Sequence, residues 1–155
     1  MELNDILEPD CVHVCAQVAD KPALLAGLAA RAAEVTGLDE AQILGALMQR
    51  EELGSTGLGN GIAIPHGKIS GLDKVLALFA KVDPAIEFDA VDDQPVDLVM
   101  MLLAPPGAGA DHLKALARVA RLLRSDQVAE ALRGARTAED LYRVLMEPLP
   151  DSVAA

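Results

Sequence analysis

The stretch "KVLALFAKVDPAIEFDAVDDQPVDLVMMLLA" (residues 74–104) contains two nearly continuous apolar runs, at 74–82 and 96–104. Apolar runs of this length predict strands that are buried on both faces of a sheet. The acidic connection at 83–95 carries Pro84 and Pro95, so it cannot be helical throughout. Two strands of this kind need helices on both sides of the sheet, and this requirement points to an α/β fold.

Helix signals lie on both sides of this stretch. Each predicted helix follows a capping residue, and most end at a glycine or before a proline. The capping residues are Asp20, Asp39, Asp111, Ser125 and Thr137, and two further strands are predicted at 12–18 and 62–65. The element order β-α-α-β-β-β-α-α-α predicts a three-layer α/β/α sandwich with a mixed sheet. We expect one domain over residues 1–155, with 149–155 as a frayed tail.

Apolar spacing predicts which helix faces are buried. The helix after Asp20 is expected to turn an apolar stripe inward that continues as far as Val35. The stripe predicted for the helix over 112–125 consists of Leu113, Leu116, Ala117, Ala120 and Leu123.

Charge and hydropathy exclude two classes of partner. The chain carries 13 Lys and Arg against 24 Asp and Glu, a formal net charge of −11. Such a surface repels nucleic acid and anionic lipid, so we expect no nucleic-acid partner. The longest apolar runs, at 75–80 and 98–104, are far shorter than the roughly 20 residues that span a bilayer, so we expect no insertion into a membrane. The N-terminus "MELNDILEPD" lacks the basic and then apolar order of a signal peptide. The expected location is therefore cytoplasmic.

The two cysteines lie in "CVHVC" (11–15) within the first predicted strand. Residues i and i+4 of a strand are about 13 Å apart, which is too far for a shared zinc ion or a disulfide. We predict neither for this segment.

A glycine-rich segment, "GLGNGIAIPHGK" (57–68), presents His66 after Pro65. It lacks the Walker A spacing, because five residues rather than four separate Gly61 from Gly67. The dinucleotide fingerprint also fails, because Ile62 stands where its third glycine belongs. From spacing alone, His66 is either a nucleophile beside a phosphate-binding loop or an exposed turn residue. His112, at the start of a helix, is a weaker candidate, and His13 is expected to be structural.

The segment "QREELGSTGLGNGIAIPHGK" (49–68) resembles the active-site signature of enzyme IIA proteins of the phosphoenolpyruvate-dependent phosphotransferase system. The match is to the fructose/mannitol-type superfamily, and the Gly-Asn-Gly at 59–61 is typical of its nitrogen-related branch. The segments 92–105 and 112–124 extend the match over nearly the whole chain. The resemblance implies an α/β/α fold and a phosphoryl group carried on His66. It also implies that His112 is a second active-site histidine and that Arg50 lines the site.

Phosphoryl transfer between histidines also needs donors for the phosphoryl oxygens. Besides Arg50 and His112, the candidates are the hydroxyls of Ser55 and Thr56 and the backbone N–H groups around Gly67. No metal or cofactor is expected, because the donor phosphohistidine is already activated.

The resemblance implies a small phosphohistidine carrier protein (HPr-like) as donor, and regulated target proteins as partners. The sequence ends close to its last predicted helix, without a fused IIB or IIC domain, and this favours regulation. Two alternatives stay open. The chain is either a sugar-transport IIA that passes phosphate to a separate IIB protein, or an interaction module that has lost transfer.

Overall fold

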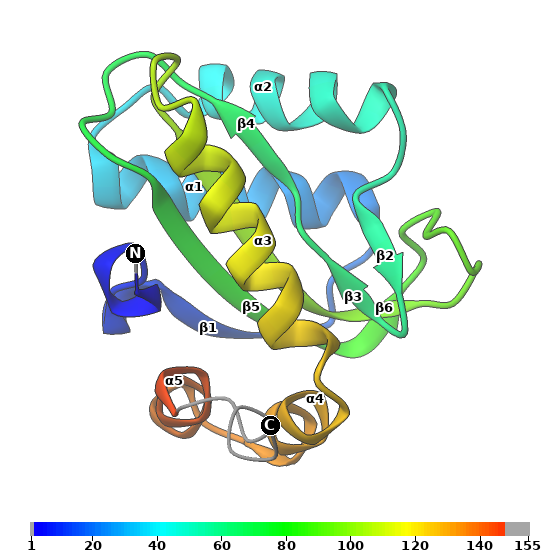
Figure 1. Ribbon diagram of the computed structural model, residues 1–155. Coiled ribbons are helices and arrows are strands. Elements are labelled where there is room, and N and C mark those ends of the chain that lie inside the picture. The colour runs from blue at the N-terminus through cyan, green and yellow to red at the C-terminus, as the bar shows by residue number, and fades with distance from the viewer. Residues whose placement is uncertain (1, 148–155) are drawn as a thin grey trace.

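The computed structural model describes residues 2–147, which form a six-stranded mixed sheet with helices on both faces (Figure 1). The strands run in the order β1-β5-β6-β3-β2, and β4 also pairs with β6. Strands β1, β3 and β4 lie parallel to their neighbours β5 or β6, whereas β5 and β6 pair antiparallel, as do β2 and β3. Their bounds are β1 Val12–Ala16, β2 Gly57–Gly59, β3 Ile62–Ala63, β4 His66–Lys68, β5 Leu76–Ile86 and β6 Val96–Ala104.

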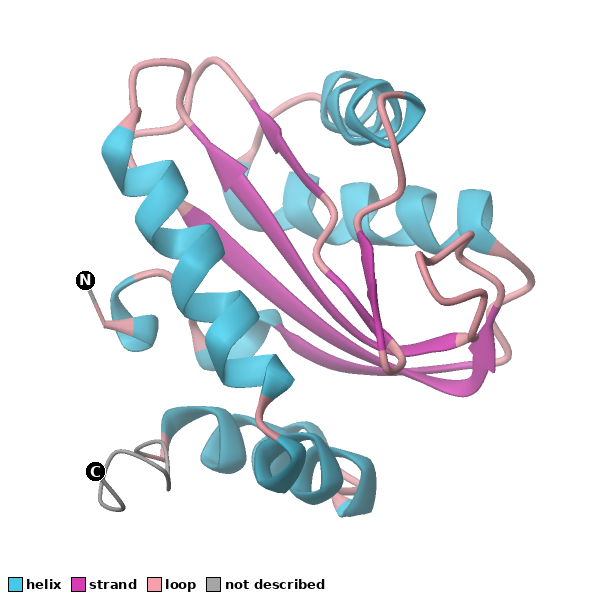
Figure 2. Cartoon of the chain, turned by 45° about the vertical axis from the view of Figure 1, so that its right-hand side comes forward, coloured by secondary structure: helices cyan, strands magenta, loops and turns pink. Residues whose placement is uncertain are grey.

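The helices form two outer layers. Helices α1 and α2 cover one face of the sheet, and α3, α4 and α5 lie on the opposite side, as the turned view makes clear (Figure 2). Their bounds are α1 Lys21–Thr36, α2 Glu40–Glu52, α3 Ala110–Arg124, α4 Asp126–Gly134 and α5 Ala138–Met146. Two short 3-10 turns, Leu3–Asp5 and Pro9–Cys11, precede β1. The predicted three-layer sandwich with a mixed sheet is confirmed.

The core lies around β6, where every residue except Asp97 is buried. Its partner β5 buries four consecutive residues, at 77–80. The core is almost entirely aliphatic, since Phe79 and Phe88 are its only aromatic members among the described residues. The two apolar runs at 74–104 are therefore the central strands, as their composition predicts.

Four of the predicted caps are confirmed. The side chains of Asp20, Asp39, Ser125 and Thr137 each accept a hydrogen bond from a backbone N–H in the first turn of their helix. Gly37 ends α1 in the left-handed conformation, with φ of 75°. Of the described helices, none combines the length and the apolar character needed to cross a bilayer.

The glycine-rich segment differs from its prediction as a loop followed by one strand at 62–65. Its first part forms β2, the predicted strand ends at Ala63, and His66 begins the separate strand β4. Three-residue strands carry too little pattern to be recognised, and β4 forms by pairing with the distant β6 rather than by local preference. The predicted frayed tail, 149–155, lies outside the described residues.

The predicted apolar stripe of α3 was right in part: Leu123 is buried and Leu116 and Ala120 pack partly buried on the core, whereas Leu113 and Ala117 are exposed. The predicted cap at Asp111 was wrong. The helix begins two residues earlier than predicted, at Ala110 after Gly109, so Asp111 lies inside its first turn. Leu113 is 69% exposed, and the buried face consists of His112, Ala115, Val119, Leu122 and Leu123. The prediction considered apolar residues only and so left out the buried His112. The predicted buried face is therefore displaced around the helix from the observed one. Val35 of α1, also expected inside, is 48% exposed.

Two glycines give a matched test of the packing. In α2, Gly45 has no neighbour within 4 Å of an added Cβ, whereas a Cβ at Gly57 would lie 2.7 Å from Cβ and 2.9 Å from Cα of Ala90. We expect Gly45→Ala to raise the free energy of unfolding by about 0.5–1 kcal/mol, since alanine loses less entropy in a helix. Gly57→Ala should lower it by about 1–3 kcal/mol through overpacking. Equilibrium urea unfolding measures both, and equal effects of the two variants would contradict the packing described.

Candidate active site

Strand β4 places His66 at an edge of the sheet between the two helical layers. The strand pairs parallel with β6, His66 opposite Leu102, and the N–H of Leu102 donates to the carbonyl of Pro65 over 2.9 Å. The imidazole is partly buried, and its Nδ1 lies 2.8 Å from the carbonyl oxygen of Ile64. A carbonyl oxygen can only accept, so Nδ1 carries the proton.

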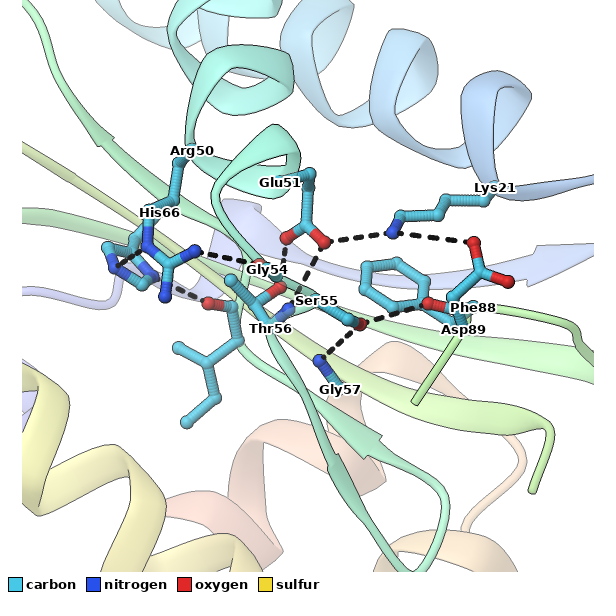
Figure 3. A network of polar contacts seen from close by, with 11 residues as sticks. Lys21, Arg50, Glu51, Gly54, Ser55, Thr56, Gly57, His66, Phe88 and Asp89 are labelled. Atoms are coloured by element: carbon cyan, nitrogen blue, oxygen red, sulfur yellow. Dashed lines mark hydrogen bonds and ion pairs between the residues drawn. The ribbon is translucent and has the colours of Figure 1, made fainter. Parts of the chain in front are cut away.

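Arg50 contacts the other ring nitrogen from the last turn of α2. Its Nε–H donates to Nε2 of His66 over 3.2 Å, and its Nη1 donates to the carbonyl of Gly54 over 2.8 Å (Figure 3). A guanidinium has only donors, so Nε2 must present its lone pair. The two contacts agree on one tautomer, in which Nδ1 carries the proton and Nε2 carries the lone pair that accepts from Arg50.

His112 approaches from the opposite helical layer, in the first turn of α3. The ring centroids of His66 and His112 are 5.6 Å apart, and the rings lie edge to face at 75°. His112 is 7% exposed, and its Nε2 has no hydrogen-bond partner among the described residues. Arg50, His66 and His112 thus converge, although they are far apart in the sequence.

The surroundings of both rings favour their neutral form. Burial lowers the pKa of His66, and the Arg50 charge lowers it further, while the Ile64 carbonyl and the Glu51 charge oppose the shift. The pKa of His112 is also lowered, first by burial and then by repulsion from a protonated His66 and from the Lys68 charge. A neutral imidazole keeps the lone pair that a nucleophile needs.

The hydroxyls of Ser55 and Thr56 have other partners. Oγ of Ser55 donates to the carbonyl of Phe88 and accepts from the N–H of Gly57, both over 3.0 Å. Thr56 is buried, and its hydroxyl and N–H both donate to the carboxylate of Glu51. These contacts hold the loop after α2 in place. Phosphate binding by the two hydroxyls stays a prediction.

Gly67 is the last predicted phosphate ligand, and it lies within β4. An added Cβ there would lie 3.1 Å from Cβ of Ala46, so the glycine lets β4 approach α2 closely. This packing accounts for the glycine, and its predicted role toward phosphate stays a prediction.

Glu51 and Lys21 are site residues that the sequence did not single out. The carboxylate of Glu51 lies 2.9 Å from Nζ of Lys21, which in turn lies 4.5 Å above the ring of Phe88 (Figure 3). The charged run at 49–52 favours a solvated face, and nothing in it marks one carboxylate as buried. Among the described residues no group of His, Cys, Asp and Glu is placed to hold a metal ion.

Comparison with known proteins identifies the family. A model of "Phosphoenolpyruvate-dependent sugar phosphotransferase system, EIIA 2" matches residues 5–147. The chain belongs to this EIIA type 2 family. It is therefore related to phosphotransfer components, and the resemblance inferred from residues 49–68 is confirmed.

Three similar proteins illustrate the range of the EIIA type 2 family. A nitrogen regulatory protein of Bradyrhizobium diazoefficiens is 50% identical over 155 residues, 100% of both chains. A PTS system fructose-specific EIIA component of Haloferax volcanii is 40% identical over 79% of each chain. The crystal structure of nitrogen regulatory protein IIA-Ntr from Neisseria meningitidis has a TM-score of 0.85 at 32% identity, covering 92% of this chain and 98% of that one.

The arrangement predicts how His66 titrates. We expect the pKa of His66 to lie below that of a free imidazole, so the neutral ring persists as the pH falls below about 6.5. In Arg50→Ala the pKa of His66 should rise, because a positive neighbour is removed. NMR titration of the ring protons measures both.

The matched control is Arg31→Ala, because Nη1 of Arg31 contacts Nδ1 of His13 over 2.9 Å instead. That variant should leave the titration of His66 unchanged. An unshifted His66 in Arg50→Ala would contradict the Arg50 contact.

Proposed function

We propose that the protein is a phosphoryl carrier, which accepts a phosphoryl group on Nε2 of His66 from a phosphohistidine carrier protein. Its phosphorylation state then regulates partner proteins in the cytoplasm. The observation that carries this proposal is the pair of contacts on one ring, Nδ1 to the Ile64 carbonyl and Nε2 to Arg50. Together they hold a neutral imidazole with its lone pair in a defined position.

The proposed reaction forms one bond and breaks one. The lone pair of Nε2 attacks the phosphorus atom of the donor, the N–P bond of the donor breaks, and the donor ring keeps its electron pair. Positive charge that develops on the His66 ring is offset where Nδ1–H donates to the carbonyl of Ile64. Charge spreads over the three phosphoryl oxygens in such a transfer, so alignment and cationic donors supply most of the catalysis.

Arg50 and His112 are the proposed donors to these oxygens. Arg50 needs only a small movement, because its Nε–H already points at the atom that would carry the phosphorus. The buried Nε2 of His112 has no hydrogen-bond partner within residues 2–147, and a phosphoryl oxygen beside the His66 ring would supply one. Ser55 and Thr56 would bind phosphate only after giving up their present partners, so we assign them to the support of the loop.

The regulatory role rests on similarity, and one relative favours a second candidate. The 50% identical relative is named a nitrogen regulatory protein and matches over its full length. The 40% identical relative is named a fructose-specific EIIA component, which favours transfer to a sugar-specific IIB protein. The two candidates share the chemistry at His66 and differ in the fate of the phosphoryl group.

Labelling tests the site. Incubated with phosphoenolpyruvate, the first enzyme of the system and the carrier, the protein should gain an acid-labile, base-stable phosphate that His66→Ala abolishes. His13→Gln is the matched control, because His13 contacts Arg31 and not the site, so it should be labelled like the wild type. Equal labelling of His66→Ala and wild type would refute the assignment.

The two-histidine arrangement makes a separate prediction. His112→Ala should still accept phosphate, but on the order of 10²-fold more slowly, as expected for the loss of one transition-state donor. Rapid-quench labelling gives the rate. An unchanged rate would remove His112 from the mechanism.

The acceptor distinguishes regulation from sugar transport. If the protein is regulatory, its phosphorylated form should keep its label when mixed with a fructose-specific IIB protein, and partner capture should differ between the two states. Rapid loss of label to the IIB protein would favour transport. If partner binding is unchanged by phosphorylation and by substitution of His66, the result would favour a pure interaction module.

A further inference from the structure

We infer that Glu51 is a positioning residue for phosphoryl transfer, which acts through Thr56 and the loop at 53–56 to hold Arg50 against Nε2 of His66. This inference rests on the proposed function of His66. It assigns a role to a carboxylate that makes no contact with the reacting ring.

The side chain of Glu51 is buried and has several polar partners. Its side chain is 6% exposed, and its two oxygens receive three donors. Oε1 accepts from the N–H of Thr56 over 3.1 Å and lies 2.9 Å from Nζ of Lys21, while Oε2 accepts from the hydroxyl of Thr56. A buried carboxylate needs such partners, because an uncompensated buried charge is costly.

The contacts of Glu51 fix the position of the loop that comes after α2. Glu51 is in the last turn of the helix, and Thr56 is five residues further along the chain, so the carboxylate closes the loop back onto the helix end. Gly54 lies inside the closed segment. Its carbonyl is the oxygen that accepts from Nη1 of Arg50.

The same loop therefore determines where the Arg50 guanidinium lies. With Nη1 bonded to Gly54, the guanidinium plane is set and Nε–H meets Nε2 of His66. Figure 3 shows the chain of contacts running from Lys21 through Glu51 and Thr56 to the loop, and from Gly54 through Arg50 to His66. Because an in-line transfer depends on position, a loosened guanidinium lowers the rate even though it keeps its charge.

Lys21 supplies the opposite charge that the buried Glu51 carboxylate pairs with. Its ammonium group pairs with Glu51, lies over the Phe88 ring and also comes within 4.0 Å of Asp89. The carbonyl of Phe88 accepts a hydrogen bond from the hydroxyl of Ser55. This is a second contact that holds the loop at 53–56 in place. The support thus links α1, α2 and the segment at 88–89.

Thr56→Val is the main test, because it removes the hydroxyl that Glu51 accepts from while keeping volume, charge and the backbone N–H. We expect the maximal rate of phosphoryl acceptance to fall roughly 10-fold or more, with an unchanged KM for the phosphocarrier. Thr56→Ser, which restores the hydroxyl, should recover the wild-type rate. Glu51→Gln is the second variant, and thermal melting checks that each one folds.

A second readout reports on Arg50 without any phosphoryl transfer. In Thr56→Val the carboxylate charge remains, so a loosened Arg50 should raise the pKa of His66 in an NMR titration, in the same direction as Arg50→Ala. In the Arg50→Ala background, Thr56→Val should change neither the rate nor the pKa further. A merely structural defect would instead add to the loss in both backgrounds.

The outcomes separate this inference from the proposed function. If wild type accepts no phosphate on His66, the proposed function fails, and the titration alone decides whether Glu51 holds Arg50. If wild type is labelled, but Thr56→Val keeps its maximal rate and its His66 pKa and Glu51→Gln keeps its maximal rate, the inference is overturned. A raised KM with an unchanged maximal rate would also overturn it, because that result would place Glu51 in docking.

Discussion

The parallel pairing of β4 with β6 determines where every group of the site lies. His66 is the first residue of this short strand, and its register opposite Leu102 decides which way the imidazole points, because a slip by one residue reverses every side chain. The strand lies at an edge of the sheet, so residues from both helical layers reach it. Arg50 comes from one layer and His112 from the other, and without this edge position the two would be separated by the sheet.

Much of this architecture arises from local chemistry in the sequence. The central strands, the caps at Asp20, Asp39, Ser125 and Thr137, and the left-handed Gly37 each depend on a few adjacent residues. The convergence of Arg50, His66 and His112 was expected from the family resemblance, and spacing alone left His66 undecided between a nucleophile and an exposed turn residue.

The remaining features depend on contacts between distant segments. Strand β4 pairs with β6, more than 30 positions away, and β2, which pairs locally with β3, packs against the equally distant Ala90. In the sequence Glu51 is one of several charged residues in a hydrophilic run. Its burial becomes evident only from the folded chain, where Lys21 and Thr56 contact its carboxylate. The buried face of α3 was misjudged for a related reason, since a histidine that completes a site occupies a core position that the apolar pattern leaves out.

In the resting state one N–H of Arg50 already occupies the lone pair of Nε2. Loading the ring would exchange that acceptor for a phosphoryl oxygen a bond length or two away, and unloading would exchange it back. Because neither direction demands a large rearrangement, the cost of reorganisation is nearly symmetrical. In the proposed phosphoryl carrier, this would let the loaded fraction follow changes in the ratio of charged to uncharged donor quickly in both directions.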